Sequence, residues 1–494
     1  MKSFIPLEAV QIERNFCDVA PAFSRAQAKV EADRCLYCYD APCTRACPTH
    51  IDVPAFIKKI SSDNVVGSAR VIFDANPIGA TCARVCPTSA LCEGACVENT
   101  LLHKPIDIGR LQRFATDYAI DSRRPMFFSG EPNGKSVAII GAGPAGYSCA
   151  VYLKRLGYAV TIYDRRELAG GLDTYGMAEY KMTQKVSVEE TNLARGIGVE
   201  FRLGTEVTPE LLVQLELDND AIFLAVGLGQ TTKLGVEGEN APGVFDALQW
   251  IEQVKTREWT GIPVGRTVAV IGAGNTAVDA ATQAKRLGAE RVVMVYRRGE
   301  AEMPAYDYEY ELAKSDAVEF RWKSAPVGIV TDANGAVRSL KCVETLPTVP
   351  DEKGRVAYGM VEGSEFEIPC DMVIKALGQS KMTAFLSGIA GLQLDGSGRV
   401  KVDEGTMATG NPKYFAGGDC VNGGREAVDA AQMGKLGAMG IHQFISGEIV
   451  EFAGARLPFV EKLPHEIELP VPTPIAHPEA SAAELGVKSY AAQG

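Results

Sequence analysis

The fold of most of the chain is decided by residues 136–146, which read SVAIIGAGPAG. The first five form a short apolar run rich in β-branched side chains, which is typical of a buried parallel strand. The pattern G-x-G-x-x-G follows directly, residues 147–156 are expected to form a helix, and a second apolar run at 159–163 ends in Asp164. This order of strand, glycine loop, helix and strand predicts a dinucleotide-binding βαβ unit.

Each part of this motif has a defined role toward a dinucleotide. The glycines allow the backbone to approach a pyrophosphate at the helix N-terminus, and the acid after the second strand accepts hydrogen bonds from a ribose. An ordinary glycine turn in an α/β fold is the alternative. The residues expected to bind from this motif are Gly141, Ala142, Gly143, Pro144, Ala145, Gly146 and Asp164.

The motif occurs a second time at residues 267–277, which read TVAVIGAGNTA. A helix and a strand at 291–296 follow, and this strand ends in Arg297 and Arg298 instead of an acid. An arginine pair there suits a 2′-phosphate, so the second unit is expected to bind NADP(H) in preference to NAD(H). A solvated basic strand end is the alternative. The residues expected to bind from the second loop are Gly272, Gly274, Asn275, Thr276 and Ala277.

Three later segments are expected to complete the first nucleotide domain. Residues 220–227 and 371–378 are near copies, each a strand that ends in glycine, and both are expected where the chain crosses between the two nucleotide domains. Residues 414–419 read YFAGGD and predict an apolar strand that ends in Asp419. An aspartate there can bind the hydroxyls of a flavin ribityl chain, and the helix expected at 426–437 can direct its N-terminus at a phosphate. An ordinary helix cap is the alternative for Asp419.

The region before the first strand is rich in cysteine, since eight of the thirteen cysteines lie between Cys35 and Cys96. They form the runs C-x2-C-x4-C-x3-C-P and C-x3-C-P-x4-C-x3-C. Such density in a chain without a secretory signal predicts metal ligation rather than disulfides, and the Cys-Pro endings are typical of ferredoxins. We interpret this region as the site of two iron–sulfur clusters, with two zinc sites as the alternative.

The same region is expected to be helical. Helices are predicted at 23–32, 53–60 and 106–115, and no alternating strand pattern occurs before residue 135. The sequence therefore predicts a small N-terminal helical domain that is held together by its metal sites.

Composition narrows the partners and the location. A formal net charge of −12 argues against nucleic acid or an anionic membrane surface as a partner. The N-terminus has no apolar signal region, and the chain has no run of 18 apolar residues, so a cytoplasmic location is expected.

The expected fold class combines α and α/β: a helical [4Fe–4S] domain followed by two Rossmann-like domains, the second inserted into the first. Six prolines after residue 451 predict an extended arm with a short helix at 480–485, which either wraps another subunit or lies on its own surface. The expected domains are 1–125 (iron–sulfur), 130–260 (FAD, first part), 261–372 (NAD(P)H), 373–450 (FAD, second part) and 451–494 (arm).

Residues 1 to about 447 resemble the N-terminal electron-input half of dihydropyrimidine dehydrogenase, which is a separate subunit in bacteria. Three stretches carry the resemblance: CLYCYDAPC at 35–43, NPIGATCARVCPTS at 76–89 and IGRLQ at 108–112. The small subunit of glutamate synthase is similar over the same span and is the main alternative. The resemblance implies FAD, two [4Fe–4S] clusters and a nicotinamide nucleotide as cofactors.

The resemblance also implies how the ligands divide between the clusters. In this family one cluster ligand is a glutamine side chain, and Gln112 stands at that place, which leaves Cys82 unligated. The implied ligands are Cys35, Cys38, Cys43 and Cys96 for the first cluster, and Cys47, Cys86, Cys92 and Gln112 for the second.

Further cofactor contacts follow from the same resemblance. Lys181 stands where the family often has an arginine at a flavin phosphate. The additional residues implied for FAD are Gly170, Gly171, Leu172, Val207, Gly418, Glu426 and Ala427, and those implied for the nicotinamide nucleotide are Ala376, Leu377 and Gly378.

The implied activity is electron transfer from NAD(P)H through FAD and the clusters to a partner subunit. That partner would hold FMN and further iron–sulfur clusters and reduce uracil or thymine, so a hetero-oligomer is expected. Hydride and electron transfer need no acid or base from the protein, and the five histidines are scattered, so no catalytic side chain is expected. Besides a glutamate synthase small subunit, a stand-alone NADPH:ferredoxin or quinone reductase and a non-catalytic redox scaffold are the alternatives.

Overall fold

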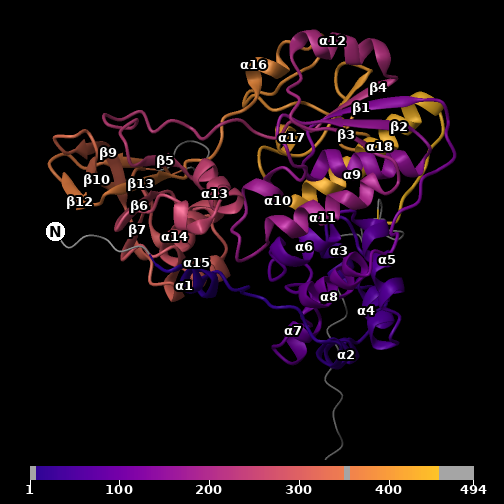
Figure 1. The fold of residues 1–494 in the computed structure, drawn as a ribbon, viewed down its shortest axis with the longest axis horizontal. Coiled ribbons are helices and arrows are strands. Elements are labelled where there is room, and N and C mark those ends of the chain that lie inside the picture. Colours follow the sequence, from indigo (N-terminus) through magenta and orange to yellow (C-terminus); the bar gives the residue numbers. More distant parts are fainter. Residues whose placement is uncertain (1–6, 350–355, 455–494) are drawn as a thin grey trace, which may run out of the picture. The chain divides into compact units, whose positions relative to one another are not determined.

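Two parallel β-sheets, each built on one glycine-loop motif, organise the nucleotide-binding part of the structure (Figure 1). The computed structural model describes residues 7–349 and 356–454, which belong to one compact unit. The arm expected at 451–494, with its helix, lies outside the described residues beyond position 454.

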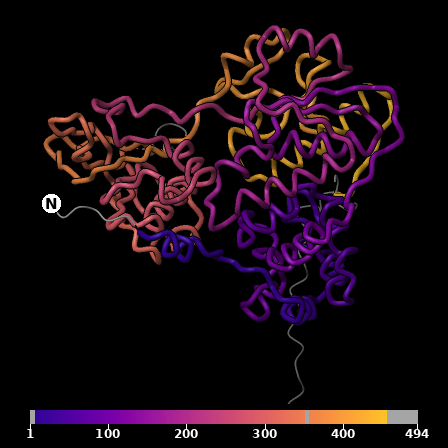
Figure 2. The backbone as a smooth tube through the Cα atoms, viewed as in Figure 1, coloured from indigo at the N-terminus to yellow at the C-terminus, as the bar shows by residue number. Residues whose placement is uncertain are grey.

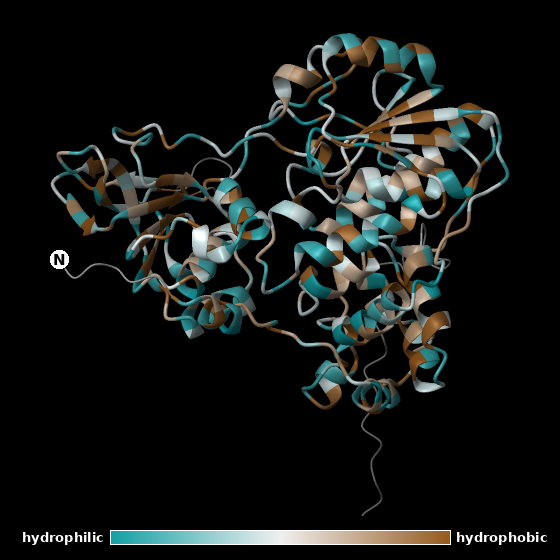
Figure 3. Cartoon of the chain, viewed as in Figure 1, coloured by the Kyte–Doolittle hydropathy of each residue, from teal (hydrophilic) through white to brown (hydrophobic). Residues whose placement is uncertain are grey.

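The first sheet has five parallel strands in the order β14-β4-β1-β2-β3. Strand β1 lies in its centre, between β2 and β4, and its last four residues are buried. Both faces of a parallel sheet are covered by helices, which is why its strands are nearly all apolar, as the brown strands of Figure 3 illustrate. The strands are β1 (Ser136–Ile140), β2 (Ala159–Tyr163), β3 (Glu200–Arg202), β4 (Ala221–Leu224) and β14 (Tyr414–Ala416).

Helices α9 and α18 pack against each other beside this sheet. Helix α9 follows β1, and α18 comes after β14. Because β1 and β14 are parallel strands of one sheet, both helices begin near its carboxyl edge. The helices of this domain are α9 (Pro144–Arg155), α10 (Leu172–Tyr175), α11 (Gln184–Arg195), α12 (Pro209–Asp218), α16 (Thr383–Leu386), α17 (Asp419–Asn422) and α18 (Ala427–Ser446).

The second sheet also has five parallel strands, in the order β5-β13-β6-β7-β8. They are β5 (Val244–Asp246), β6 (Thr267–Ile271), β7 (Arg291–Val295), β8 (Glu319–Arg321) and β13 (Met372–Lys375). The accompanying helices are α13 (Ala247–Thr256), α14 (Asn275–Arg286) and α15 (Asp307–Ser315), with the short 3-10 turns η1 (Trp259–Gly261) and η2 (Glu300–Glu302).

An antiparallel sheet that the sequence analysis did not foresee packs on the second sheet. Its strands are β9 (Ser324–Thr331), β10 (Val337–Pro347), β11 (Tyr358–Met360) and β12 (Phe366–Pro369), with β10 between β9 and β12. Ile329 and Leu340 share a buried apolar cluster with Ile271 and Val293 of the parallel sheet. This layer takes the place that helices occupy in the first domain.

Strand pairing corrects the expected domain boundaries. Residues 371–378 were expected in the first domain, but β13 pairs with β5 and β6 and so belongs to the second sheet. Strand β5 and helix α13 also belong to the second domain, although both precede residue 261. The pairing decides the domain here because the two strand copies are indistinguishable by local pattern.

The crossing points themselves lie where the sequence predicted them, after β4 and after β13. The two crossing segments run side by side, as Figure 2 shows. The amide of Gly229 donates to the Ser380 carbonyl oxygen at 2.8 Å, and the amide of Ser380 donates to the Gln230 carbonyl oxygen at 2.8 Å. The second nucleotide domain is thus connected to the first through a short two-stranded ribbon.

The described residues from 7 to 130 contain helices and no strand, in agreement with the expected helical domain. Their helices are α1 (Ala9–Asn15), α2 (Arg25–Asp33), α3 (Pro42–Ala46), α4 (Val53–Ser61), α5 (Val65–Ala75), α6 (Gly79–Val85), α7 (Glu98–Leu101) and α8 (Ile108–Asp121). In the part of the chain that can be described, no helix combines the length and apolar character needed to cross a membrane.

Helix α1 is an exception to the expected N-terminal domain. Ile12 and Phe16 are buried in the core of the second nucleotide domain, and the Phe16 ring stacks on Trp259 with centroids 4.6 Å apart. The boundary expected at 1–125 is therefore corrected at its start. Burial of a large apolar side chain such as Phe16 is worth roughly 1.5 to 3 kcal/mol, and its stacking on the partly buried Trp259 adds about 1 kcal/mol, so this segment favours the second core.

The helices of the N-terminal domain and the first nucleotide domain share one continuous apolar core. Phe73 of α5 and Leu111 of α8 lie in the same core as Tyr152 of α9. The Tyr152 hydroxyl also donates to the Asp74 carbonyl oxygen at 2.9 Å. Whatever the cysteine region binds is therefore attached firmly to the domain that carries the first glycine loop.

Candidate functional site

The first glycine loop leaves its backbone uncovered at the N-terminus of α9. A side chain is impossible at Gly141, where φ is +110° and a Cβ would lie 2.1 Å from the Ala225 carbonyl oxygen. Gly143 and Gly171 face each other so closely that a Cβ on Gly171 would lie 2.8 Å from the Gly143 Cα. This pair of bare backbones at a helix N-terminus fits the pyrophosphate of a dinucleotide such as FAD.

Asp164 lies at the end of β2, as predicted, and it holds the loop in place. Its Oδ2 accepts the amide of Ala142 at 2.7 Å, and its Oδ1 accepts the amide of Arg166 at 2.8 Å. The side chain is half-buried. The acid therefore joins the glycine loop to the end of the neighbouring strand, next to where a ribose would lie.

The second half of the first site comes from the segment after β14. Asp419 begins α17, and burial raises the pKa of its carboxyl while the amide of Arg425 lowers it. Glu426 is the N-cap of α18, and its Oε1 accepts the hydroxyl of Tyr306 at 2.7 Å. Glu426 was expected at the flavin; its carboxylate is engaged by a tyrosine of the second nucleotide domain.

Tyr306 was not foreseen in the sequence, because no motif marks it. Its amide donates to Asn275 Oδ1 at 3.3 Å beside the second glycine loop, while its hydroxyl reaches Glu426. Burial and the Glu426 carboxylate raise the pKa of Tyr306, and the nearby Cys86 thiol acts in the same direction. This tyrosine therefore lies where the two nucleotide domains and the cysteine region meet.

The second glycine loop repeats the first in outline. Gly272 has a φ of +130°, and a Cβ there would lie 2.4 Å from the Ala376 carbonyl oxygen, whereas nothing lies within 4 Å of a Cβ on Gly274. The segment 376–378 therefore borders this loop, as predicted for a nicotinamide nucleotide site. Thr276 and Ala277 follow in the first turn of α14.

Arg297 and Arg298 follow β7, and their backbone is fixed by neighbouring strands. The Thr345 hydroxyl donates to the Arg297 carbonyl oxygen at 2.6 Å, and the Lys323 amide donates to that of Arg298 at 2.9 Å. Within residues 7–349 and 356–454, neither guanidinium forms an ion pair. Both side chains therefore remain available for an anionic group of a ligand.

Lys181 joins the two nucleotide domains. Its ammonium lies 2.5 Å from both Asp279 Oδ1 and Glu309 Oε1, which belong to the second nucleotide domain. Burial alone would lower the pKa of Lys181, but the two carboxylates outweigh it and raise that pKa. A contact of Lys181 with a flavin phosphate stays a prediction. Val207, whose backbone was expected at the flavin, has its side chain in the apolar core beside the first sheet.

Four cysteines of the N-terminal domain line one hollow, and they are the four implied for the first cluster: Cys35, Cys38, Cys43 and Cys96. Burial raises the pKa of Cys35, and it raises that of Cys43 to about 12, with further contributions from the neighbouring thiols. The raised pKa of Cys35 and Cys43 fits a site where a positive metal charge compensates the thiolates.

The second cysteine group is partly buried, like the first. The pKa of Cys86 is raised well above its usual value by its hydrogen bond with Cys82, by burial and by the charges of Cys47 and Cys92. Burial, Glu93, Cys47 and Cys43 raise that of Cys92. The three cysteines implied for the second cluster are therefore neighbours, and Cys43 joins them to the first group.

Two side chains compete for the place of a fourth ligand in the second group. The buried Cys82 Sγ accepts the Asn76 Nδ2 at 3.1 Å and contacts Cys86. Gln112 on α8 is also buried, and its Nε2 donates to the Gly79 carbonyl oxygen at 2.7 Å, at the start of the helix that ends next to Cys86. That hydrogen bond occupies the amide nitrogen and leaves the Gln112 oxygen as an acceptor.

The thiols surround a hollow instead of meeting at one point. Among the residues that the structure describes, no three His, Cys, Asp or Glu side chains are placed to hold a metal ion. A tetrahedral zinc ion would hold its sulfurs at about 2.3 Å, whereas an iron–sulfur cluster separates its ligands by iron and sulfide. The four cysteines that line the first hollow are the ones that the resemblance implies for one cluster.

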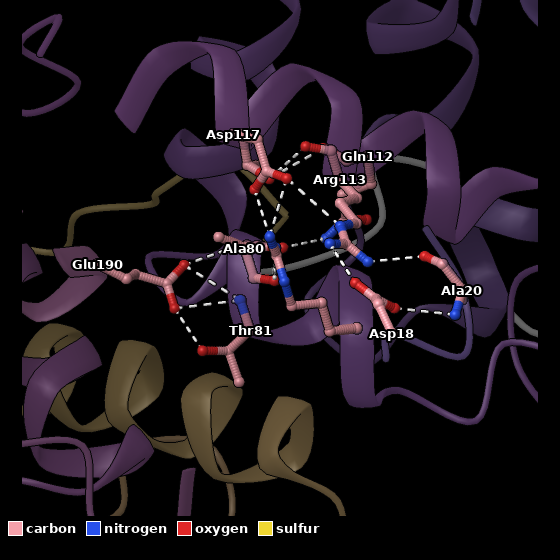
Figure 4. A network of polar contacts seen from close by, with 11 residues as sticks. Asp18, Ala20, Ala80, Thr81, Gln112, Arg113, Asp117 and Glu190 are labelled. Carbon is pink, nitrogen blue, oxygen red and sulfur yellow. Dashed lines mark hydrogen bonds and ion pairs between the residues drawn. The ribbon is translucent and has the colours of Figure 1, made fainter. Parts of the chain in front are cut away.

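Glu190 on α11 is a further residue that no motif predicted. It is buried, and it accepts the amides of Ala80 at 2.6 Å and Thr81 at 3.1 Å and the Thr81 hydroxyl at 2.5 Å (Figure 4). Burial raises the pKa of Glu190 to about 7, outweighing these hydrogen bonds. A carboxylate from the first nucleotide domain thus caps α6, the helix that leads into Cys86.

Comparison with protein families divides the chain in the same way. Residues 12–124 match the family model described as dihydropyrimidine dehydrogenase domain II, 4Fe-4S cluster. Residues 135–434 match the model described as pyridine nucleotide-disulphide oxidoreductase.

The chain matches two proteins from Escherichia coli (strain K12) over nearly the whole length of each. The chain is 37% identical to the glutamate synthase [NADPH] small chain over 454 residues, which are 89% of this chain and 96% of that protein. It is 34% identical to the NAD-dependent dihydropyrimidine dehydrogenase subunit PreT over 439 residues, which are 88% of this chain and 98% of that protein.

A solved structure of Mycobacterium tuberculosis FprA in complex with NADPH shares the fold. It has a TM-score of 0.52 and 18% sequence identity, and the match covers 64% of this chain and 85% of that one. At that identity the likeness concerns the fold alone, and it agrees with the two parallel sheets described above.

Proposed function

The chain belongs to the pyridine nucleotide-disulphide oxidoreductase family and carries an N-terminal 4Fe-4S domain, and from this premise we propose that it is the electron-input subunit of a dihydropyrimidine dehydrogenase. It is an oxidoreductase of the flavin and iron–sulfur type. In the proposed reaction NADPH is oxidised at the nucleotide domains, and electrons leave through the cysteine region to a partner subunit.

The residues divide this work as follows. Bound FAD would convert the two-electron chemistry of a nicotinamide into single-electron steps. The bare backbone of Gly143 and Gly171 would hold its pyrophosphate, and Asp419 would orient its ribityl chain. No side chain has to move a proton, so the protein's contribution is positioning and exclusion of water.

We propose two [4Fe–4S] clusters with the ligands implied by the resemblance. The shared hollow of the four first-group cysteines supports the first cluster. The second would be held by Cys47, Cys86, Cys92 and Gln112. Because Glu190 of the first nucleotide domain caps the helix that leads into Cys86, the second group is the one expected to receive electrons from the flavin. The first would then pass them on.

The preference for NADP(H) is proposed on the basis of Arg297 and Arg298. Their guanidinium groups lack ion-pair partners among the described residues and lie after the strand where a 2′-phosphate would sit. Replacing both by alanine should weaken NADPH binding by tenfold or more, about 1.4 kcal/mol, and leave NADH nearly unchanged. Equal losses for both nucleotides, measured as KM in an NAD(P)H–ferricyanide assay, would refute the preference.

The partner is proposed to hold FMN and further clusters and to reduce uracil or thymine. Gln112 at the end of the IGRLQ stretch is the observation that carries this choice, since it is the ligand that distinguishes pyrimidine-reducing relatives in the resemblance. A glutamate synthase is the second candidate, because its small chain is the relative with 37% identity.

One experiment separates these possibilities. The chain is isolated from its source with any bound subunit, and NADPH oxidation is followed with uracil, with thymine, and with glutamine plus 2-oxoglutarate. Dihydrouracil formation supports the proposal, and glutamate formation without uracil turnover replaces it with the second candidate. Isolation without a partner, together with reduction of ferredoxin or a quinone, would instead identify a stand-alone reductase.

A further inference from the structure

Lys435 on α18 is a lysine with no exposed surface. Its Nζ donates to the carbonyl oxygens of Thr49 at 3.1 Å and Ala453 at 2.9 Å. Thr49 lies two residues after Cys47, and the hydroxyl of Thr49 is 3.4 Å from the Cys47 Sγ. The ammonium group therefore lies beside the second cysteine group, although it comes from the helix that begins at the first nucleotide site.

The other buried lysines are neutralised in a different way. Lys255 pairs with Glu179 at 2.8 Å, and Lys375 pairs with Glu239 at 2.8 Å. Lys435 has no carboxylate partner within residues 7–349 and 356–454. An unpaired ammonium away from water costs several kcal/mol, so a second source of negative charge is required.

The groups around Lys435 identify that source. Burial lowers the pKa of Lys435 to about 7, and the charge of Arg155 acts in the same direction. The geometry points to the other side: the Lys435 Nζ donates to the Thr49 carbonyl oxygen, and the Thr49 hydroxyl is in contact with the Cys47 Sγ. Tyr152, whose ring centroid is 5.7 Å from the Nζ, adds an aromatic face but no formal charge. The anionic group that compensates Lys435 is thus on the side of Cys47.

We propose that Lys435 is the counter-charge of the iron–sulfur cluster held by Cys47, and that it raises the reduction potential of that cluster. The proposal rests on the proposed function, which places a cluster there. Reduction adds one electron to the cluster and breaks no bond, and the negative charge of the bound cluster keeps the buried Lys435 in its ammonium form. A fixed positive charge stabilises the state with the extra electron, since net charge near a cluster is one of the terms that set its potential.

The consequence concerns the direction of electron flow. Lys435 is a positioning residue that touches no substrate, and its charge makes the second cluster a better acceptor for electrons from the flavin. The first group has no equivalent lysine in its hollow, whose lining residues include no cation. The effect should therefore fall on one cluster and not on the other.

The test compares Lys435→Met with the wild-type full-length chain, both with reconstituted clusters. An EPR-monitored redox titration measures the potential of each cluster. In the variant, the ratio of reduced to oxidised second cluster at a fixed potential should fall at least tenfold, about 59 mV for a one-electron couple. The first cluster should shift by much less. No shift, or an equal shift of both clusters, overturns the proposal.

Two further variants separate charge from packing. Lys435→Arg keeps the positive charge and should retain the wild-type potential. Lys255→Met removes a buried lysine that has its own carboxylate, and it should leave both potentials unchanged.

Loss of the cluster gives a second readout, the iron content. If Lys435→Met and Lys435→Gln lose the second cluster and Lys435→Arg keeps it, the charge is required and the proposal stands. Loss in all three variants shows a packing role only and overturns it. A wild-type chain without a second cluster signal would instead contradict the proposed function, so the two failures are distinguishable.

Discussion

The two cysteine groups differ in what surrounds them. The hollow of the first group is lined only by residues between Cys35 and Ile108, so the N-terminal domain builds it alone. Beside the second group, Glu190 caps the helix that leads into Cys86, and Lys435 donates to the Thr49 carbonyl oxygen two residues after Cys47; both come from distant parts of the chain. Ligand spacing is a local property of the sequence, whereas the surroundings that tune a redox centre are assembled by the fold.

The cysteines of both groups are partly buried, and individual neighbours of the two groups differ in exposure. Tyr39 is fully exposed and Leu36 is 52% exposed, and both adjoin ligands of the first group. Cys82 beside the second group is buried, and α6 is capped from the nucleotide domain. The contact of α6 with the first nucleotide domain, and not the exposure of the cysteines, is what favours the second group as the entry point of electrons.

The largest expected effect is the loss of one cluster. Cys35→Ser and Cys47→Ser should each remove about half of the iron, since each cluster of this type contributes equally to the total. With Cys35→Ser, NADPH should still reduce the second cluster; with Cys47→Ser, the first cluster should stay oxidised. Iron analysis and EPR after addition of NADPH measure both.

The opposite result would reverse the proposed order. If the first cluster is reduced in Cys47→Ser at the wild-type rate, electrons do not need to pass through the second group. Cys17→Ser is the matched control, because Cys17 is exposed and lies outside both groups.

The sequence predicted the first group better than the second, and the reason is physical. Cys35, Cys38 and Cys43 lie within nine residues, so helix and loop geometry alone brings them together. Glu190 lies more than a hundred residues after the helix that it caps, and no spacing rule connects them. The existence of strands β1, β2 and β4 also followed from pattern, whereas their order in the sheet was not predicted.

Tertiary contacts determine features that the sequence analysis missed. Strand β13 resembles β4 in every local respect, yet its hydrogen bonds to β6 place it in the second sheet. Lys181 matched a family position, but two acidic side chains on α14 and α15 compete for its charge. These partners lie far away in the sequence, so a local sequence pattern could not predict the contacts with them.

The next prediction tests the fourth ligand of the second group. Gln112→Leu removes the side-chain oxygen and should lower the iron bound by the second group, whereas Cys82→Ser should leave the iron content unchanged. Iron analysis with EPR of the reduced protein distinguishes the two variants. Unchanged iron in Gln112→Leu with loss in Cys82→Ser would assign the fourth ligand to the cysteine and weaken the comparison with pyrimidine-reducing relatives.

A smaller effect is expected from Glu190→Ala. The change leaves the amides of Ala80 and Thr81 buried without their acceptor, so the free energy of unfolding should fall by about 1 to 3 kcal/mol. Urea denaturation followed by flavin fluorescence measures it. Glu189→Ala is the matched control, because the neighbouring Glu189 is partly exposed and has only a long contact with Lys185. Equal losses in both variants would mean that the cap does not stabilise the second group.

The smallest expected effect is the pH dependence that Glu190 gives to stability. Burial raises its pKa to about 7 in the folded protein, against 4.5 for an ordinary glutamate. The folded state therefore keeps a proton that the unfolded state has lost, and this contribution is complete below pH 4.5 and disappears as the pH rises through 7. Between pH 6 and pH 8 the wild type should lose on the order of 1 kcal/mol relative to Glu190→Gln, which does not titrate.

The comparison of wild type and Glu190→Gln at the two pH values isolates this group, because all other carboxyls and the cysteines titrate equally in both proteins. A stability difference that is independent of pH would show that Glu190 is already ionised when folded. In that case the amides of α6 and the charge of Arg84 outweigh burial, and the cap would act on the second group as a permanent negative charge. A pH-dependent difference, in contrast, would mean that Glu190 is largely protonated and neutral below pH 7. Lys435 would then be the charged side chain that distinguishes the second group from the first.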